Sequence, residues 1–456
     1  MLAVVTPEEM AAIDAAAPEP VEELIERAGF AVARRARSLM GGTYGRRVVV
    51  VNGPGNNGRD GLVAARLLAA GGARVASFEA AHVPSRLEHV DLVIDAAFGT
   101  GFRGSYTFPE TSATVLAVDI PSGLDGLTGV AGGRPAEATS TITFAALKPG
   151  LLLGDGPQFA GSIEVADIGL DVSGTNTWLV QDADVTAWFP ERATDAHKWR
   201  SALWIVGGSP NMTGAPRLAA AAALAAGAGY VRLSSPSAAL DGAPVECVTV
   251  SLPPVGWARA MLSNLDRIAA AVVGPGLGRD ESTRAEVCEV ATAADLPLVI
   301  DGDGLWAVAE LRGRMHESPR VMTPHDGEYT QLAGHPPGAD RVAAARRLAA
   351  ERSCVVVLKG PTTIIADARG RVRMVVSGDE RLASAGTGDV LSGMIGAMLA
   401  AGADPFDAAA AAAHVHGLAG RRLPPVGASA SLLPSEVSGV LSTLTSARPR
   451  PSIEAQ

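Results

Sequence analysis

The feature of this sequence that most limits its fold is a series of short apolar segments, each ending in a loop of glycine and polar residues. The first, Arg47–Asn52, reads RVVVVN and runs into Gly-Pro-Gly-Asn-Asn-Gly, after which a helix is expected over 60–70. β-Branched runs of this kind are typical of strands buried on both faces of a parallel sheet. The pattern recurs at 92–96, 115–120 and 141–146. Repeated strand–loop–helix units predict a doubly wound α/β fold with ligands at the carboxyl ends of its strands.

A second series of such units follows a polar, proline-containing stretch at 182–197. Strands are expected there at 202–207, 230–234, 271–274, 298–301, 320–323 and 354–359, with an alanine-rich helix over 215–226, a hairpin over 362–376 and helices starting near Asp389 and Pro405. A chain of 456 residues is long enough for two or three domains. We therefore predict an α/β domain over 1–190 and a second over 191–450.

Composition excludes several classes of protein. The formal net charge of −10 argues against binding to nucleic acid or to an anionic membrane, because it provides no overall positive field. The three cysteines are far apart and form no CxxC pair, so reduced thiols in the core are expected. The N-terminus lacks the basic and apolar regions of a signal peptide, and no long apolar run suggests a membrane span. These observations predict a cytoplasmic protein.

Three strand-end loops of the first domain carry polar side chains. Asn57, Asp95 and Ser122 would converge as oxygen ligands at adjacent strand ends, which predicts a monovalent-cation site. Asp119 would then remain free as a proton-transfer group. The loop at 53–58 also reads as GxGxxG, with Glu79 as a ribose-binding acid, or as a structural turn. The two asparagines and Asp60 are unusual for a dinucleotide fingerprint.

The second domain contains Ser-Ala-Gly-Thr-Gly-Asp at 384–389. Gly-x-Gly at a helix start presents unpaired N–H groups to an anion, helped by the helix dipole. The adjacent Asp389 could take a proton from a hydroxyl that attacks phosphorus, while charge on the transferred phosphoryl group lies against those amides. The alternative is an ordinary helix cap. Neither a Walker A motif nor a kinase Gly-rich loop is present in the sequence.

A further strand-end pair, Asp301 and Asp303, could touch phosphate-bound magnesium or could simply cap a loop.

The first-domain motifs GNNGRDG (55–61), DAAFGTG (95–101), DIPSGLD (119–125) and ALKPG (146–150) resemble those of the NAD(P)HX epimerase family, over roughly residues 1–175. The resemblance implies a Rossmann-like three-layer domain that interconverts the R and S epimers of hydrated NADH and NADPH (NADHX and NADPHX). It implies K⁺ at Asn57, Asp95 and Ser122, a catalytic Asp119 and Lys148 as a further candidate. The implied substrate contacts are Asn56, Asn57, Gly58, Arg59, Asp60, Gly99, Thr100, Gly101, Phe102, Arg103, Gly104, Ser105 and Asp119.

The second-domain motif GTGD resembles the anion hole and catalytic base of the ribokinase-like superfamily. Thr-Pro-His-Asp-Gly-Glu at 323–328 is similar to the strand-end motif in which a glutamate, here Glu328, organises Mg²⁺ through water. Together with segments 197–198, 207–215, 273–278, 357–363 and 386–393, the set resembles the ADP-dependent NAD(P)HX dehydratase family. This implies a ribokinase-like α/β/α domain.

The dehydratase resemblance also implies a mechanism. Asp389 would deprotonate the ring hydroxyl for attack on the β-phosphate of ADP, and the phosphate ester would then leave, giving NAD(P)H, AMP and phosphate. The residues implied on the hydrated-nicotinamide side are Ala215, Gly278, His325 and Asp389. Those implied on the ADP/AMP side are Lys359, Gly360, Pro361, Thr362, Thr363, Gly386, Thr387 and Gly388.

We therefore predict a bifunctional enzyme that repairs NADHX and NADPHX with K⁺, Mg²⁺ and ADP as co-substrate, and that forms a homo-oligomer. One alternative is an ATP-dependent kinase of a vitamin or sugar, because GTGD is shared across the superfamily. Another is a non-catalytic, nucleotide-binding N-terminal domain, because Arg59 replaces the glycine usual in the family and the spacers between motifs are shorter.

Overall fold

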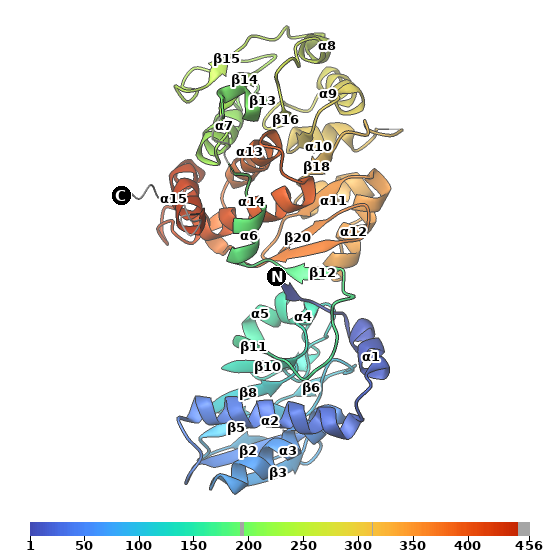
Figure 1. Cartoon of the computed structure of the whole chain (residues 1–456), viewed down its shortest axis with the longest axis vertical. Helices are drawn as coiled ribbons and strands as arrows, with labels where there is room; N and C mark the ends of the chain where they lie inside the picture. The colour runs from blue at the N-terminus through green and yellow to red at the C-terminus, as the bar shows by residue number, and fades with distance from the viewer. Residues whose placement is uncertain (192–195, 312, 446–456) are drawn as a thin grey trace, which may run out of the picture. The chain divides into compact units, whose positions relative to one another are not determined.

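The computed structural model describes residues 1–191, 196–311 and 313–445, which form two compact α/β units (Figure 1). Leu2–Trp178 form the first unit, and the second begins at Leu179 and includes Met1. This division precedes the predicted boundary at 190, because helix α6 (Asp182–Trp188) packs on α14 (Pro405–Gly420) and α15 (Leu433–Thr445). The predicted domain end at 450 lies outside the described residues.

The first unit is built on a parallel sheet with the order β11-β10-β8-β5-β2-β3. Its strands are β2 (Arg47–Asn52), β3 (Arg74–Glu79), β5 (Leu92–Ala96), β8 (Thr114–Val118), β10 (Ser140–Phe144) and β11 (Ser162–Ala166). The shorter elements are β1 (Leu2–Ala3), which pairs with β12 (Thr177–Leu179), and β4 (Arg86–Leu87), β6 (Tyr106–Thr107), β7 (Glu110–Thr111), β9 (Gly133–Arg134), α1 (Pro7–Ala16), α4 (Pro149–Leu152) and α5 (Gly156–Phe159).

Both faces of the inner strands of this sheet are buried, as the β-branched runs predict, whereas the edge strand β3 is largely exposed. Val48 and Val50 of β2 lie in one core with helices α2 (Val21–Met40) and α3 (Asn56–Ala70). Val49 and Val51 lie in a second core, whose cover includes Leu87, Phe108 and Ala136. This second cover comes from loops and short strands rather than from long helices. The three layers of the Rossmann-like fold are thus a helical layer, the sheet and a largely irregular layer.

The second unit contains a larger sheet that runs in the order β21-β20-β19-β18-β17-β16-β13-β14-β15. Neighbours from β15 to β19 are parallel, and β19, β20 and β21 are antiparallel, so the hairpin expected over 362–376 is confirmed. The strands are β13 (Ala202–Val206), β14 (Tyr230–Ser234), β15 (Val248–Thr249), β16 (Ala270–Val273), β17 (Leu298–Ile300), β18 (Arg320–Met322), β19 (Val355–Leu358), β20 (Thr363–Ala366) and β21 (Val372–Val375).

Small residues allow the helices of the second unit to approach closely. A Cβ atom at Gly393 of α13 would lie 2.0 Å from the carbonyl oxygen of Ala219 in α7, so only glycine fits at this crossing. The helices are α7 (Gly214–Ala225), α8 (Trp257–Leu262), α9 (Glu281–Ala293), α10 (Asp303–Val308), α11 (Asp326–Ala333), α12 (Arg341–Arg352) and α13 (Thr387–Ala400), besides α6, α14 and α15. Within the described ranges, no helix is both long and apolar enough to cross a bilayer.

Candidate active sites

A cavity of about 490 Å³ opens at the carboxyl ends of the strands of the first unit. Its lining includes these residues expected from the sequence: Asn56, Asn57, Asp60, Gly99, Thr100, Gly101, Phe102, Asp119 and Lys148. Gly58, Arg59, Arg103, Gly104 and Ser105 do not line it. The Arg59 side chain instead reaches the Glu22 carboxylate at 3.4 Å, and Arg103 and Gly104 line a smaller cavity of about 240 Å³.

Asp119 is not free in this cavity, contrary to the expectation from the sequence. Its Oδ1 lies 2.8 Å from Lys148 Nζ and accepts a hydrogen bond from the Thr143 hydroxyl at 3.1 Å. The Lys148 side chain is only 1% exposed, and its ammonium also donates to the Thr143 hydroxyl and to two backbone carbonyls. Asp119 itself has a left-handed backbone, with φ of 65°. The pair therefore holds a buried positive charge against a carboxylate that faces the cavity.

Of the three residues expected to bind a cation, Asp95 and Ser122 are in contact, and the described contacts include none between Asn57 and either of them. The buried Asp95 carboxylate accepts from the Ser122 hydroxyl at 2.6 Å and from the Ser122 N–H at 2.9 Å, and burial raises the pKa of Asp95 to about 6. The amide oxygen and nitrogen of Asn57 are both buried without a hydrogen-bond partner. A buried amide oxygen with unused lone pairs and a buried carboxylate are the donors that K⁺ accepts, so these residues fit the ion.

Three more carboxyl groups line the same cavity as Asp119, those of Asp14, Glu19 and Asp60. Burial raises the pKa of Asp60 to about 8, helped by the nearby negative charge of Asp119 and opposed by Arg59. Asp14, on α1, was not found from the sequence. Burial raises the pKa of Asp14 as well, with Lys148 lowering it and Asp119 adding to the rise. No spacing or motif connects residue 14 with the strand-end loops, so only the folded position of α1 shows this contact.

The second unit presents the Gly-Thr-Gly-Asp segment at the start of α13. Gly386 has φ of 94°, which lets the chain turn sharply into the helix. The Thr387 hydroxyl donates to the carbonyls of Leu382 and Ser384 at 2.9 and 3.1 Å, which fixes the loop. Burial raises the pKa of Asp389 to about 7, with Asp301 adding to the rise and Lys359 opposing it. Asp389 is therefore suited to accept a proton near neutral pH.

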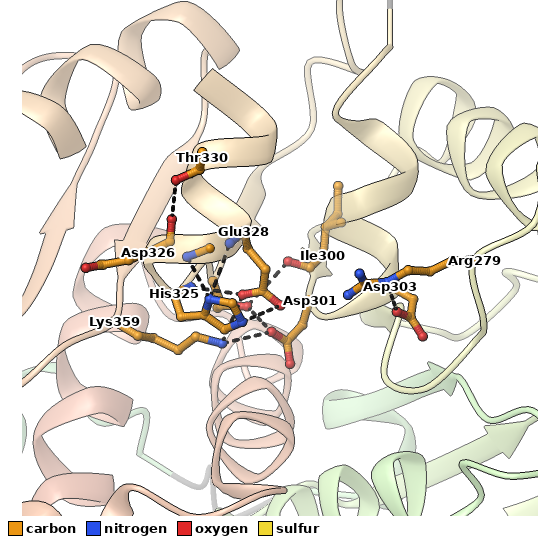
Figure 2. Close-up of polar contacts among 11 residues, drawn as sticks. Arg279, Ile300, Asp301, Asp303, His325, Asp326, Glu328, Thr330 and Lys359 are labelled. Carbon is orange, nitrogen blue, oxygen red and sulfur yellow. Dashed lines mark hydrogen bonds and ion pairs between the residues drawn. The ribbon is translucent and has the colours of Figure 1, made fainter. Parts of the chain in front are cut away.

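Lys359 lies among the acidic groups that come from neighbouring strand ends (Figure 2). Its Nζ is 3.4 Å from Asp301 Oδ1 and 3.6 Å from Glu328 Oε2. Burial alone would lower the pKa of Lys359, but these two carboxylates raise it above its ordinary value. A Cβ at Gly388 would lie 3.2 Å from the same Nζ, so Lys359 adjoins the Gly386–Gly388 turn.

His325 and Glu328 are tied together at the start of α11. The Glu328 carboxylate accepts a hydrogen bond from the backbone N–H of His325 at 2.9 Å. The ring Nδ1 of His325 accepts from the backbone N–H groups of Gly327 and Glu328. In the neutral ring the proton is therefore on Nε2. Within the described part of the chain, no group of three His, Cys, Asp or Glu side chains could hold a metal ion. A Mg²⁺ ion at Glu328 would therefore have to take most of its ligands from water and from the phosphate oxygens of a bound nucleotide.

The remaining predicted residues lie on loops or at the first residues of α7 and β20. A Cβ at Gly276 would lie 3.2 Å from the Cβ of Ala215, so the loops at 207–215 and 274–278 are adjacent. The Gly278 N–H donates to Asp303 Oδ2 at 2.9 Å. The Lys359 carbonyl accepts from Arg341 at 2.9 Å, and Gly360 lies against the same guanidinium. Pro361, Thr362 and Thr363 lead into β20, and the structure gives no distance from them to Gly386–Gly388.

The chain is similar to known families over most of its length. A family model described as NAD(P)H-hydrate dehydratase matches residues 203–441, and one described as YjeF-related protein N-terminus matches residues 21–85 and 77–150. The bifunctional NAD(P)H-hydrate repair enzyme Nnr of Salinibacter ruber is 38% identical over 88% of each chain.

Solved structures resemble the second unit. A ribokinase-like superfamily protein from Enterococcus faecalis has a TM-score of 0.52 at 23% identity, covering 60% of this chain and 98% of its own. The ADP/ATP-dependent NAD(P)H-hydrate dehydratase from Bacillus subtilis has a TM-score of 0.52 at 28% identity, covering 58% and 97%. The second unit is thus a ribokinase-like domain. The chain belongs to the family of bifunctional NAD(P)H-hydrate repair enzymes.

Proposed function

We propose that the second unit dehydrates S-NADHX and S-NADPHX at the expense of ADP, with Asp389 as the catalytic base. Asp389 takes the proton of the ring hydroxyl, and the hydroxyl oxygen attacks the β-phosphorus of ADP. The bond between that phosphorus and AMP breaks. The ring carbon–oxygen bond then breaks, phosphate leaves with the bonding electrons, and loss of a neighbouring ring proton restores the double bond of NADH or NADPH.

The observation that carries this proposal is the position of Asp389 beside the Gly386–Gly388 turn at the start of α13. Backbone N–H groups of that turn would oppose the charge that develops on the transferred phosphoryl group. Lys359 adjoins the same turn and supplies a fixed positive charge on the side implied for the nucleotide.

We propose that Glu328 orders the water shell of Mg²⁺ on the nucleotide, because its buried carboxylate lies 3.6 Å from Lys359, on the side implied for the nucleotide. When bound, the ion would neutralise phosphate charge.

For the first unit we propose epimerisation of the same hydrated cofactors. Asp119, held by Lys148, would exchange a proton with the ring hydroxyl of the substrate in the cavity. Asn57, Asp95 and Ser122 would hold K⁺, which supplies positive charge near the phosphates or the ring hydroxyl. The unpaired amide of Asn57 supports this assignment.

The kinase alternative is not favoured, since the relatives that match both units are named as repair enzymes. The rate of exchange between R and S epimers, measured with the full chain in the presence and absence of K⁺, distinguishes an epimerase from a nucleotide-binding module. A nucleotide-binding module would not accelerate the exchange. The homo-oligomer and the cytoplasmic location stay predictions.

The test of the proposed function is incubation of the chain with hydrated NADH and ADP, following absorbance at 340 nm together with AMP and phosphate. We expect stoichiometric NADH, AMP and phosphate, and none of them with Asp389→Ala. A stable phosphorylated product, or full turnover by Asp389→Ala, would overturn the assignment.

A further inference from the structure

One cation beside the dehydratase site has no role in the mechanism above. Arg279 follows Gly278 in the loop between β16 and α9, and its side chain is 48% exposed. Its Nε donates to Asp303 Oδ1 at 2.7 Å, while Asp303 Oδ2 accepts from the Gly278 N–H. Figure 2 shows Arg279 and Asp303 together with the acidic group around Lys359.

Asp303 fixes the direction of this guanidinium. The Asp303 carboxylate is buried in the first turn of α10, and both of its oxygens are used by residues 278 and 279. A guanidinium has five N–H donors, and the described hydrogen bonds of Arg279 use only the one on Nε. The outer four N–H groups are thus oriented in advance but remain available to a ligand.

The charge balance of the site calls for such a cation. Asp301, Asp303, Glu328 and Asp389 lie near one another, because Asp301, Glu328 and Asp303 all raise the pKa of Asp389. Lys359 already faces two of these carboxylates. A dinucleotide substrate brings further negative charge on its pyrophosphate, and an arginine fork is well matched to phosphate oxygens.

We infer that Arg279 binds the pyrophosphate of the hydrated dinucleotide in the dehydratase site. The inference rests on the proposed function and on the dehydratase resemblance, which implies that the hydrated nicotinamide lies beside Gly278. In a dinucleotide the pyrophosphate is separated from the nicotinamide by one ribose, whereas the 2′-phosphate of NADPHX is at the far adenosine. The residue next to Gly278 is therefore better placed for the pyrophosphate, which NADHX and NADPHX share.

The test measures steady-state dehydration of NADHX and of NADPHX by Arg279→Ala in the full chain. We expect KM to rise about tenfold for both substrates, with kcat and the KM of ADP changed less than twofold. Arg279→Lys should recover only part of the loss, because an ammonium keeps the charge but lacks the fork. The rise of KM with ionic strength should be weaker in Arg279→Ala than in the unaltered protein.

Arg66→Ala is the matched control, because Arg66 is also exposed and paired with a carboxylate, but on the first unit. Its dehydration kinetics should not change. An effect of Arg279→Ala on NADPHX alone would assign Arg279 to the 2′-phosphate, and an effect on ADP alone would assign it to the co-substrate; either result overturns the inference, as does an unchanged KM. If Asp389→Ala is inactive while Arg279→Ala behaves as unaltered protein, only this inference fails and the proposed function stands.

Binding of the product NADH gives a readout that does not depend on turnover. Calorimetric titration should give a Kd for NADH about tenfold higher in Arg279→Ala. Equal Kd values with intact thermal unfolding would contradict a direct contact.

Discussion

At the residue scale, the rate of dehydration should follow the ionisation of Asp389. Burial raises the pKa of Asp389 to about 7, and a base accepts a proton only when ionised. We therefore expect kcat/KM to rise with pH through about 7 and to level off above it. The measurement is the initial rate at 340 nm between pH 5.5 and 9.

A phosphate group of ADP also loses a proton in this pH range. Variants of Asp389 are therefore needed to decide which group causes the rise of kcat/KM with pH. Asp389→Glu should shift the midpoint of the profile, and Asp389→Asn should lower kcat by at least about a hundredfold. If the midpoint of the profile is the same in Asp389→Glu, the rise of kcat/KM with pH is due to the nucleotide and not to Asp389. Asp266→Asn, which alters an exposed carboxylate, should leave the profile unchanged.

Asp95 should couple K⁺ to the stability of the first unit. Its buried carboxylate lacks a cationic partner among the described contacts, so a bound ion would offset the cost of burying the charge. We expect K⁺, compared with tetramethylammonium at equal ionic strength, to raise the melting temperature of this unit in the unaltered chain but not in Asp95→Asn. Differential scanning calorimetry provides the measurement.

The exposed Asp91 supplies the control for this experiment. Asp91→Asn should keep the full response to K⁺, and an equal response in Asp95→Asn would contradict a cation site at Asp95.

Sequence reasoning identified polar side chains at the strand ends of the first unit, but not how they are paired, and of Asn57, Asp95 and Ser122 only Asn57 lines the cavity. Asn57, Asp95 and Ser122 could be grouped because each follows or adjoins a strand end. The pairing of Asp119 with Lys148 depends on a left-handed residue after β8 and on a lysine from a later loop. Side-chain pairing across such loops has no periodic signature in the chain.

At the element scale, α13 depends on its glycines. The Cβ of an alanine at position 393 would lie 2.0 Å from the backbone oxygen of Ala219, so α13 and α7 would have to separate. We expect Gly393→Ala to lower the free energy of unfolding of the second unit by about 3 kcal/mol. Urea unfolding followed by circular dichroism measures the change.

Gly214→Ala is the comparison, because Gly214 begins α7 and a Cβ there meets no atom within 4 Å. Alanine at this position should stabilise slightly by reducing the freedom of the unfolded chain. A similar loss of stability in both variants would mean that the α7–α13 approach is not the cause.

Strands were easier to predict than helix starts. The run at 47–52 matches β2, whereas the helix expected over 60–70 begins at Asn56. Asn and Gly are weak helix formers, so residues 56–59 read as a loop. In the structure a Cβ at Gly58 would lie 1.9 Å from the Gly53 carbonyl oxygen, so tight packing on the preceding turn favours these residues. The helix α2 was not predicted at all.

At the scale of the whole molecule, the two units should divide the repair of an epimer mixture. Starting from mixed R- and S-NADHX with excess ADP, we expect the unaltered chain to convert all of it to NADH. In Asp119→Ala, conversion to NADH should stop when the S epimer is used up, apart from S epimer formed by uncatalysed exchange. The reason is that only the second unit would remain active. Absorbance at 340 nm and chromatography of the remaining epimer give the measurement.

Adding Asp389→Ala to Asp119→Ala should abolish NADH formation, which would show that the NADH formed by Asp119→Ala comes from the second unit. Complete conversion by Asp119→Ala at the unaltered rate would mean that Asp119 is not needed for epimerisation.

The overall α/β class and the two-unit organisation were predictable from the repeated strand–loop pattern, but the boundary was not. The stretch after 182 reads as a polar linker, yet it forms α6, whose Val185 is fully buried and whose Asp182 contacts His414 at 2.8 Å. Because α6 is short and buries only one residue, its sequence predicts neither that a helix forms there nor which unit that helix packs on.

The burial of Lys148 has a practical consequence for labelling. Lysine occurs at only three positions in the sequence, 148, 198 and 359. Lys148 is inaccessible and Lys359 is 20% exposed beside the Gly386–Gly388 turn, whereas Lys198 is exposed. An amine-reactive fluorophore should therefore attach to one side chain, Lys198, along with the terminal amine. With saturating nucleotide shielding Lys359, labelling would be confined to Lys198 and the terminal amine, without any engineered cysteine.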